Sequence, residues 1–522
     1  MTEHEVVDRA ARRLAAELVA QAPQGWTGAL LGGTASDGAM SLSGWYTVAN
    51  ASRPSRSLPD CFGELEELAR AVRAVRSWRA VSLELRCRPS GEYRLVAFST
   101  AVTWESGLSE HFQVVLDEDY RLPQPGPTQQ AGRAAEAGDP DLAVARLHAY
   151  LARRATILGH QEPPLPAPAS AAALDQAERD FGRRLPADLR ALYLTADGQR
   201  DDQDHLLDGH HWLSLASSVS LKDQFSEPLW LEWGLEWNRV VYDADPPGTV
   251  RRCGGHPAWL PFATRGDGNY LAVDLAPAGD GRPGQVIEMG RDHDDGPRHV
   301  AESVTALLGH YLDLLDQGAY RHDGDFLQLR DPAERGPREV IVKDLSDPLP
   351  PTLQVLHLNG APSPVDLTPL TAATRLRRLT LSRCSTADLT PLRALPVEAL
   401  RITLASGGDL TPLADHPHLA SLDLATTAPV DLGPLRTVPN LRGLDLSRAA
   451  VRDLSVLADL PELRFLVLDR QQWALLLDRG KLPAALAAAH LADADASLDE
   501  ALTWAAALGL DTEGAIRRTG IS

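Results

Sequence analysis

The sequence predicts a multidomain α+β protein that continues into an α/β repeat solenoid with a helical C-terminal cap. Three observations predict this fold class. Helix-like and strand-like segments alternate up to about residue 320, proline-rich stretches separate them into units, and leucine-rich phrases recur at a fixed period after residue 352. A chain of 522 residues is too long for one core and should divide into about three or four domains.

Residues 1–122 are predicted to form a smaller α+β domain. An amphipathic helix opens it, and a second helix follows in GELEELARAVRAVRSW. The stretch VSLELRCRPSGEYRLVAFS then alternates as two strands joined by a turn at residues 89–91. This order, with its GW motif and with Trp78 before the hairpin, resembles the YezG-like domains of bacterial toxin-immunity proteins. The alternative is an unclassified α+β domain with its tryptophans in the core.

Prolines mark the next boundaries, because successive prolines cannot join a helix or a sheet. PQPGP and PPLPAP bracket residues 123–164, which are predicted to be a helical linker. DPAERGP and SDPLPP mark a second linker over residues 323–351.

Residues 165–322, between these linkers, predict a central α+β module. Ser170 is suited to cap a helix that ends at Gly182, and Pro186 suits the first turn of the next helix. Strand-like runs follow in WLPFA, YLAVDL and QVIEM, and the apolar stripe of VAESVTALLGHYLDLL predicts a final helix.

The order of these motifs, from AERDFGRRLPADLRALYLTADG to VAESVTALLGHYLDLL, resembles the SUKH superfamily of Smi/Knr-type domains. The resemblance implies two helices against a twisted, antiparallel-rich sheet and a non-enzymatic role. Most bacterial members are immunity proteins that bind toxins, frequently nucleases, and fungal relatives are regulatory interaction proteins. The matching positions, which the resemblance implies are largely structural, are Leu185, Pro186, Gly198, Trp259, Pro261, Gly268, Asp274, Gly284 and Val286.

Residues 352–470 are periodic. Phrases such as LQVLHL and LRRLTL begin at residues 353, 376, 397, 419, 441 and 463, and DLTPL-like phrases recur in step with them. Two phrases at one period of about 22 residues predict a leucine-rich repeat solenoid. Residues 471–522 are rich in alanine and predict the helical cap, with a partner-binding amphipathic helix as the alternative.

Two groups of residues are predicted to bind a partner protein. Outward positions of the repeat strands form a mixed polar set suited to a protein surface, although the array can also be a spacer. These positions are His357, Thr380, Arg401, Asp423, Asp445 and Val467. Trp230, Trp233 and Trp237 would share one face of a helix, and tryptophan is enriched in interface hot spots. The favoured interpretation of these three tryptophans is nevertheless a core-facing stripe that covers the sheet.

The motifs of catalysis and of cofactor binding are weak or missing. GDGRPG at residues 279–284 matches GxGxxG but leads into a strand, so a hairpin loop is favoured over a dinucleotide site. RDHDDGPRH lacks the spacing of a calcium or zinc site and is interpreted as a solvated loop. We expect no enzyme activity, no cofactor and no metal.

Composition narrows the class of partner. A net charge of −20 opposes binding to nucleic acid or anionic lipid and attracts basic proteins. No apolar run has the length of a membrane span, the first residues are too charged for a signal peptide, and four scattered cysteines suit reduced thiols. A cytoplasmic location is therefore expected, and the preference for arginine over lysine is typical of a GC-rich bacterial genome.

Together these features predict a bacterial immunity or polyimmunity protein that neutralises a basic toxin, such as a nuclease, by binding it. A regulatory scaffold that binds a cellular partner through its repeats is the second hypothesis, and an enzyme is the third. The oligomeric state, the partner and the domain that contacts it stay open.

Overall fold

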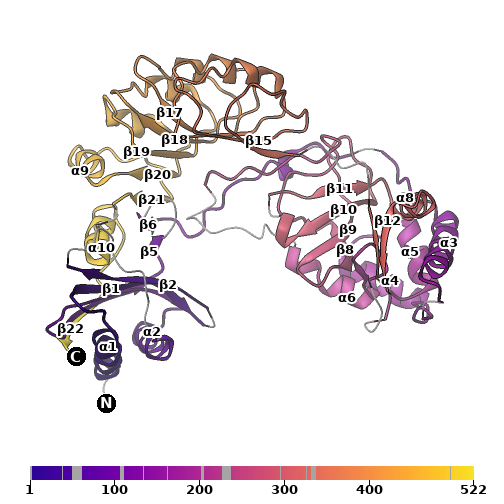
Figure 1. Ribbon diagram of the computed structural model, residues 1–522, viewed down its shortest axis with the longest axis horizontal. Coiled ribbons are helices and arrows are strands. Elements are labelled where there is room, and N and C mark those ends of the chain that lie inside the picture. The colour runs from indigo at the N-terminus through magenta and orange to yellow at the C-terminus, as the bar shows by residue number, and fades with distance from the viewer. Residues whose placement is uncertain are drawn as a thin grey trace.

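The structure is a computed structural model that describes residues 3–37, 39–49, 61–105, 111–132, 134–160, 163–200, 205–225, 237–293, 295–324, 326–330, 337–493 and 495–522. Figure 1 shows three parts: the arc of repeats, the central module, and a terminal body that contains both ends of the chain.

The terminal body is built on a sheet with the strand order β2-β1-β3-β4-β22. Its elements are α1 (Glu3–Ala20), β1 (Trp26–Ser36), β2 (Ala39–Val48), α2 (Phe62–Arg76), β3 (Ala80–Cys87), β4 (Glu92–Ser99) and β22 (Ile516–Ile521). Because successive side chains of a strand point to opposite faces, Leu31, Leu83 and Leu85 share one face and pack with Leu14 of α1 and Leu68 of α2. Both helices and the hairpin lie where the sequence predicts them.

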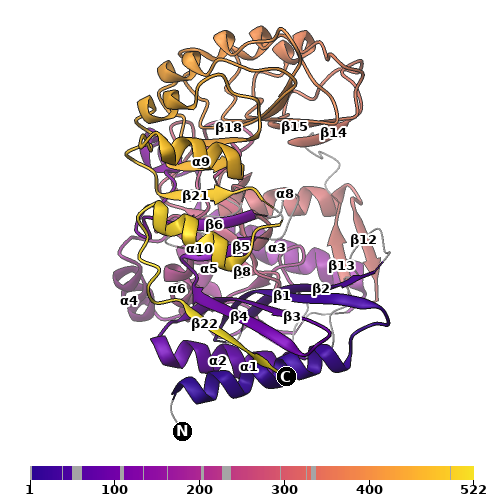
Figure 2. The same ribbon diagram turned by 90° about the vertical axis from the view of Figure 1, so that its left-hand side faces the viewer.

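The last strand of this sheet comes from the far end of the chain. β22 pairs antiparallel with β4, with Ile516 opposite Ala97 and Ile521 opposite Glu92. Helix α10 (Leu498–Ala507) lies on the face of the sheet opposite α1 and α2 (Figure 2). The terminal body is thus completed by residues more than 400 positions downstream of its first strands.

The prediction of a purely helical cap over residues 471–522 is wrong in part. The segment contains the helices α9 (Arg470–Asp478) and α10, but also the strands β21 (Ala488–Leu491) and β22. Its alanine-rich composition favours helix, yet the free edges of β4 and of the last repeat strand offer hydrogen-bond partners that only a strand can use. Tertiary pairing overrides local propensity here.

The central module has a sheet in the order β11-β10-β9-β8-β7, with helices packed against it. Its elements are α3 (Pro140–Leu158), α4 (Ala171–Phe181), α5 (Ala187–Thr195), β7 (His211–Trp212), α6 (Leu215–Ser220), β8 (Trp259–Thr264), β9 (Asn269–Asp274), β10 (Gln285–Gly290), β11 (Arg298–Ala301), α8 (Val304–Asp316), β12 (Tyr320–Asp323) and β13 (Phe326–Leu329). Ser170 caps α4 by accepting the N–H of Ala173, and Gly182 ends that helix with φ of 77°, as predicted.

Helix α3 lies within the predicted linker but belongs to the core of the central module. Its buried residues Ala143, Leu147 and Tyr150 pack with α5 and α8. The Tyr150 hydroxyl also donates to the carbonyl of Leu206 at 3.0 Å. The prediction of a helix is confirmed, whereas its role as a linker is wrong, because the apolar stripe of the helix is buried.

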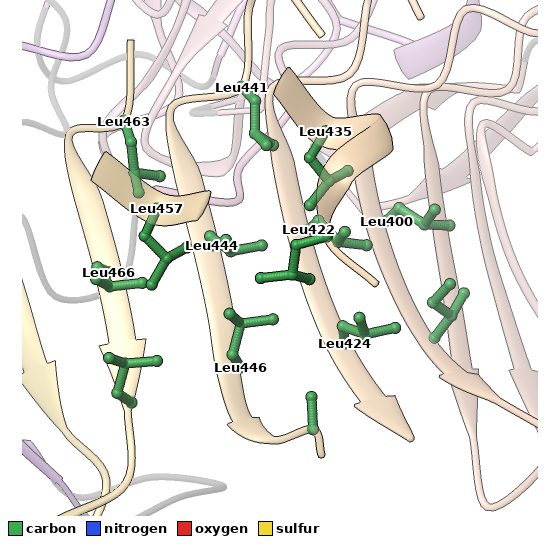
Figure 3. Close-up of a cluster of buried hydrophobic side chains, with 14 of the residues drawn as sticks. Leu400, Leu422, Leu424, Leu435, Leu441, Leu444, Leu446, Leu457, Leu463 and Leu466 are labelled. Carbon is green, nitrogen blue, oxygen red and sulfur yellow. The ribbon is translucent and has the colours of Figure 1, made fainter. Parts of the chain in front are cut away.

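The repeats stack as parallel strands. These strands are β14 (Glu339–Val342), β15 (Val355–Asn359), β16 (Arg378–Ser382), β17 (Ala399–Leu404), β18 (Ser421–Thr426), β19 (Gly443–Arg448) and β20 (Phe465–Leu468). Leucines from each unit pack against the equivalent leucines of the next, as Leu400, Leu422, Leu444 and Leu466 show (Figure 3). One unit cannot bury its leucines alone, so stacking is required.

The second repeated phrase has a clear structural role. The aspartate of each DLTPL-like phrase accepts the backbone N–H two residues later and so begins a 3-10 turn. The aspartates are Asp366, Asp388, Asp409, Asp431 and Asp453. The turns they begin are η4 (Thr368–Ala372), η5 (Thr390–Leu392), η6 (Thr411–Leu413), η7 (Gly433–Thr437) and η8 (Leu454–Asp459). The phrase therefore fixes the return of the chain from one strand to the next.

The sheet of the repeats continues into the terminal body. β21 pairs parallel with β20, β6 (His111–Val115) pairs antiparallel with β21, and β5 (Val102–Glu105) follows at the edge of this 10-stranded sheet. The repeats thus share one sheet with β21, β6 and β5, whereas the strands nearest the two chain ends form the separate five-stranded sheet. None of the helices in the described residues is both long and apolar enough to cross a bilayer.

Candidate functional site

The repeat strands gather the six predicted surface residues into one row. Parallel pairing places His357 opposite Thr380, Thr380 opposite Arg401, and Arg401 opposite Asp423. The row continues from Asp423 to Asp445 and Val467. We call these six residues the strand row. This alignment follows from the regular length of the repeats, because parallel strands pair at equivalent positions.

Exposure differs along the strand row. The side chains of His357 and Arg401 are 26% and 36% exposed, and Asp445 is partly exposed. Thr380 and Asp423 are covered, with 7% of each residue exposed. The predicted outward positions are therefore not equally accessible to a partner, and at Asp423 the side chains of Arg401 and Arg448 occupy both carboxylate oxygens.

Two aspartates lie side by side in the middle of the strand row, and they differ in their partners. Asp423 lies between two arginines, with Nε of Arg401 at 3.0 Å and Nη2 of Arg448 at 2.6 Å from its two oxygens. Asp445 accepts the N–H of Ser447 at 2.9 Å and its hydroxyl at 2.7 Å. Burial, followed by the charge of Asp423, raises the pKa of Asp445 to about 6.

The far end of the strand row is closed by the chain itself. Val467 is buried in a small apolar cluster with Phe465, and Tyr120 and Trp237 pack against that cluster. The Trp237 ring stacks on Phe465 with centroids 5.1 Å apart, and it covers Gly443, where an added Cβ would lie 2.4 Å from the ring. Val467 is thus inaccessible, contrary to its predicted role as a binding residue.

Trp237 lies in a turn and contacts the repeat sheet rather than sharing a helical stripe. The favoured interpretation, a tryptophan that faces the core, therefore describes Trp237 better. The sheet that Trp237 covers belongs to the repeats. Trp230 and Trp233 lie outside the described residues.

Sequence reasoning missed a polar contact between the central module and the repeats. Both oxygens of Glu398 are bound, by Nη1 of Arg377 at 2.7 Å and by Nη2 of Arg252 at 2.8 Å. Gln354 hydrogen-bonds the backbone of Asp243 in both directions. Gln354, Arg377 and Glu398 occupy the same position of successive repeats, one residue before each strand, so the repeat pattern itself marks the positions that make this contact.

The two motifs that resemble cofactor or metal sites have structural roles. GDGRPG connects the antiparallel strands β9 and β10, which confirms the hairpin loop. Residues 291–293 of RDHDDGPRH form a 3-10 turn in which His293 faces Glu288 at 3.6 Å. Burial opposes ionisation of Glu288, but the neighbouring His293 and the charge of Arg265 outweigh it and lower the pKa of Glu288 to about 2. No group of three or more His, Cys, Asp or Glu side chains within the described part of the chain is arranged to hold a metal.

Comparison with known proteins identifies the central module. Residues 168–310 match the SMI1 / KNR4 family (SUKH-1), which confirms the predicted SUKH resemblance. A glucan synthesis regulatory protein of Neurospora crassa is 39% identical over 88 residues, or 17% of this chain and 16% of that protein. The cell wall biosynthesis/cell cycle regulator smi1 of Schizosaccharomyces pombe is 51% identical over 85 residues, or 16% of this chain and 17% of that protein. The match thus spans about a sixth of the length of these relatives.

Among solved structures, an internalin (inlF) of Listeria monocytogenes is 27% identical over 23% of this chain and 35% of that chain, with a TM-score of 0.20. The two sequence relatives, from Neurospora crassa and Schizosaccharomyces pombe, are fungal, so a bacterial origin of this chain stays a prediction. The YezG-like character of the terminal body also stays a prediction.

Proposed function

We propose that this chain, which carries a SMI1/KNR4 (SUKH-1) domain at residues 168–310, is a cytoplasmic, non-enzymatic protein that acts by binding another protein. Its role is that of an immunity protein, which occupies a toxin and so neutralises it. The strand row is the observation that carries this proposal. It presents polar side chains of both charges in fixed register on a rigid sheet, and His357, Arg401 and Asp445 stay accessible there.

The electrostatics of the strand row support a basic partner. Arg401 and Arg448 balance the charge of Asp423, whereas Asp445 has only Ser447 as a hydrogen-bond donor within hydrogen-bonding distance in the described residues. A lysine or arginine of the partner would neutralise Asp445 and recover the free energy lost by its burial. The net charge of −20 would speed the approach of a basic protein, such as a nuclease.

A second candidate function is that of a regulatory scaffold. The matched fungal relatives are named as regulators of glucan synthesis and of cell wall biosynthesis. In this case the repeats would bind a cellular protein with no toxin involved, and the same strand row would form the contact.

Co-expression separates the two functions. The chain would be produced together with each toxin encoded beside its gene, and survival of the cells would be measured. Asp445→Lys reverses the charge in the strand row that would receive a basic partner, and Asp478→Lys, an exposed position at the end of α9, is the matched control. We expect protection from wild type and from the control, and loss of protection and of the co-purifying complex in Asp445→Lys.

The immunity role is overturned if neither the wild type nor the control variant protects the cells and no complex with a toxin appears on size exclusion. A stable complex with a host protein that is lost in Asp445→Lys, without any protection against toxins, would favour the scaffold.

A further inference from the structure

The terminal body contains a cavity of about 380 Å³ that the proposed function does not use. It lies on the face of the sheet turned away from α1 and α2, between β1, β2 and β3 on one side and β5, β6 and the start of α10 on the other. Figure 2 shows these elements stacked above the sheet. A volume of this order is at the lower end of the range for small-molecule sites.

Two glycines of β1 form the floor of the cavity. Gly28 and Gly32 lie on the same face of the strand, and Leu30 lies between them. A Cβ added at Gly28 or Gly32 would have its nearest neighbour at 3.8 or 3.6 Å, which is ordinary van der Waals contact. Gly33 differs, because its φ is +147° and a Cβ there would lie 2.1 Å from the Ser41 carbonyl oxygen.

The backbone conformation thus requires a glycine at Gly33, but it does not require one at Gly28 or Gly32. Glycine inside a strand weakens the strand, and it often marks a place where another group approaches the backbone closely. We therefore interpret Gly28 and Gly32 as residues that keep the cavity open.

The walls provide aromatic surface and hydrogen-bonding groups. The indoles of Trp45 and Trp104 have centroids 5.9 Å apart and are inclined by 49°, so they form a corner rather than a closed stack. Glu84 accepts two hydrogen bonds from Arg86, at 2.8 and 3.2 Å, and one from the N–H of Leu498 at 3.1 Å. Glu84 and Arg86 therefore neutralise each other, and the other two charged residues of the lining, Arg88 and Asp495, are of opposite sign.

One buried hydroxyl at the cavity lacks a partner. Ser82 is only 2% exposed, lines the cavity, and its Oγ has no hydrogen-bond partner in the described structure. A buried polar group without a partner is unfavourable, and a ligand that can donate or accept would satisfy it.

We propose that this cavity binds a small, neutral molecule with a flat ring and a hydrogen-bonding edge. The ring would lie over Gly28 and Gly32 and against the indoles of Trp45 and Trp104, and its polar edge would reach the hydroxyl of Ser82. A charged ligand is disfavoured because Glu84 and Arg86 already neutralise each other.

Binding can be tested on the full chain with nicotinamide, adenine and indole-3-acetamide as probes, read by ligand-observed NMR. Benzoate and cyclohexanecarboxamide test the preferences for a neutral and for a flat ligand. We expect at least one flat neutral probe to bind saturably at millimolar concentration. Benzoate and cyclohexanecarboxamide should not bind. Gly32→Val should fill the floor and weaken binding at least about tenfold, and Ser82→Ala should weaken it less.

Thr34→Val is the control, because Thr34 lies on the same face of β1 outside the cavity. It should leave probe binding unchanged. If Gly32→Val does not fold, as judged by its thermal transition, Gly28→Ala replaces it. Binding of no flat probe to the wild type would overturn the proposal, and so would equal binding by the wild type and the floor variants.

Discussion

Asp243 and Gln354 clamp the central module to the first repeats. The backbone N–H of Asp243 donates to Oε1 of Gln354 at 2.7 Å, and Nε2 of Gln354 donates to the Asp243 carbonyl at 2.8 Å. Gln354 is fully buried and Asp243 is 8% exposed, so water cannot replace either bond. This geometry holds the loop before β8 against the edge where the repeat strands begin.

Replacing Gln354 by alanine should loosen this clamp. The variant leaves a buried N–H and a buried C=O of Asp243 without partners, which costs roughly 2–4 kcal/mol. We expect calorimetry to show one main transition for the wild type, and a separate, earlier transition for the central module in Gln354→Ala. Gln328→Ala, an exposed position on β13, should unfold like the wild type. An unchanged Gln354→Ala profile would contradict the clamp.

The second prediction concerns the ion pairs of Glu398. Its partners Arg252 and Arg377 have side chains only 8% and 14% exposed, so Glu398→Gln leaves two poorly hydrated guanidinium groups facing a neutral amide. Breaking a buried pair in this way costs about 3–5 kcal/mol. Glu462→Gln removes an exposed pair with Arg464 and should cost less than about 1 kcal/mol.

The two losses can be compared by the midpoints of thermal unfolding of the purified variants. Equal midpoints for Glu398→Gln and Glu462→Gln would show that the contact between the central module and the repeats does not depend on the charge of Glu398.

The third prediction is a loss of stability in mild acid that depends on His210. Nε of Arg265 donates to Nε2 of His210 at 3.2 Å, and Nδ1 lies 3.2 Å from the carbonyls of Leu207 and Asp208, so the geometry suits a neutral ring. Burial, followed by the charge of Arg265, lowers the pKa of His210 from 6.5 to about 4. The unfolded chain therefore binds a proton more readily than the folded chain, and stability falls as the pH drops from about 6.5 to 4.

The shift of His210 corresponds to at most about 3 kcal/mol at pH 4. His210→Gln should flatten the pH dependence of the unfolding midpoint of the central module over this range. His148→Gln, an exposed histidine on α3, should leave the dependence as steep as in the wild type. An equally steep profile in His210→Gln would assign the acid sensitivity to other groups.

Much of the candidate site follows from periodicity, and the parts that do not follow depend on distant pairing. The repeat period was sufficient to place His357, Arg401 and Asp445 in one row, because parallel strands align equivalent positions. The contact of Trp237 with Phe465 joins two parts of the chain that share no local pattern. The pairing of β22 with β4 could not be predicted from the local sequence either, because a short strand is stabilised mainly by the sheet edge with which it pairs.

The last prediction is that Asp445 trades stability for binding. Its pKa is raised from 3.8 to about 6, mainly by burial and then by Asp423, so the folded chain holds this proton more tightly than the unfolded chain. Ionised Asp445 therefore destabilises the fold above about pH 6, and this cost disappears as the pH falls toward 4. Asn at this position keeps the oxygen that accepts from Ser447 and removes the charge. Asp445→Asn should stabilise the repeats at pH 7 by up to about 3 kcal/mol and have little effect at pH 4.

The same change should weaken binding of a basic partner, because the carboxylate that would receive its lysine or arginine is gone. Asp366→Asn, an exposed aspartate at the start of η4, is the control and should alter neither property, since Asn can still accept the N–H of Thr368. Thermal unfolding at both pH values and titration calorimetry with the partner measure the two effects. A variant that is no more stable than the wild type at pH 7 would show that the charge of Asp445 carries no cost, and with it the argument for a cationic partner at this position would fail.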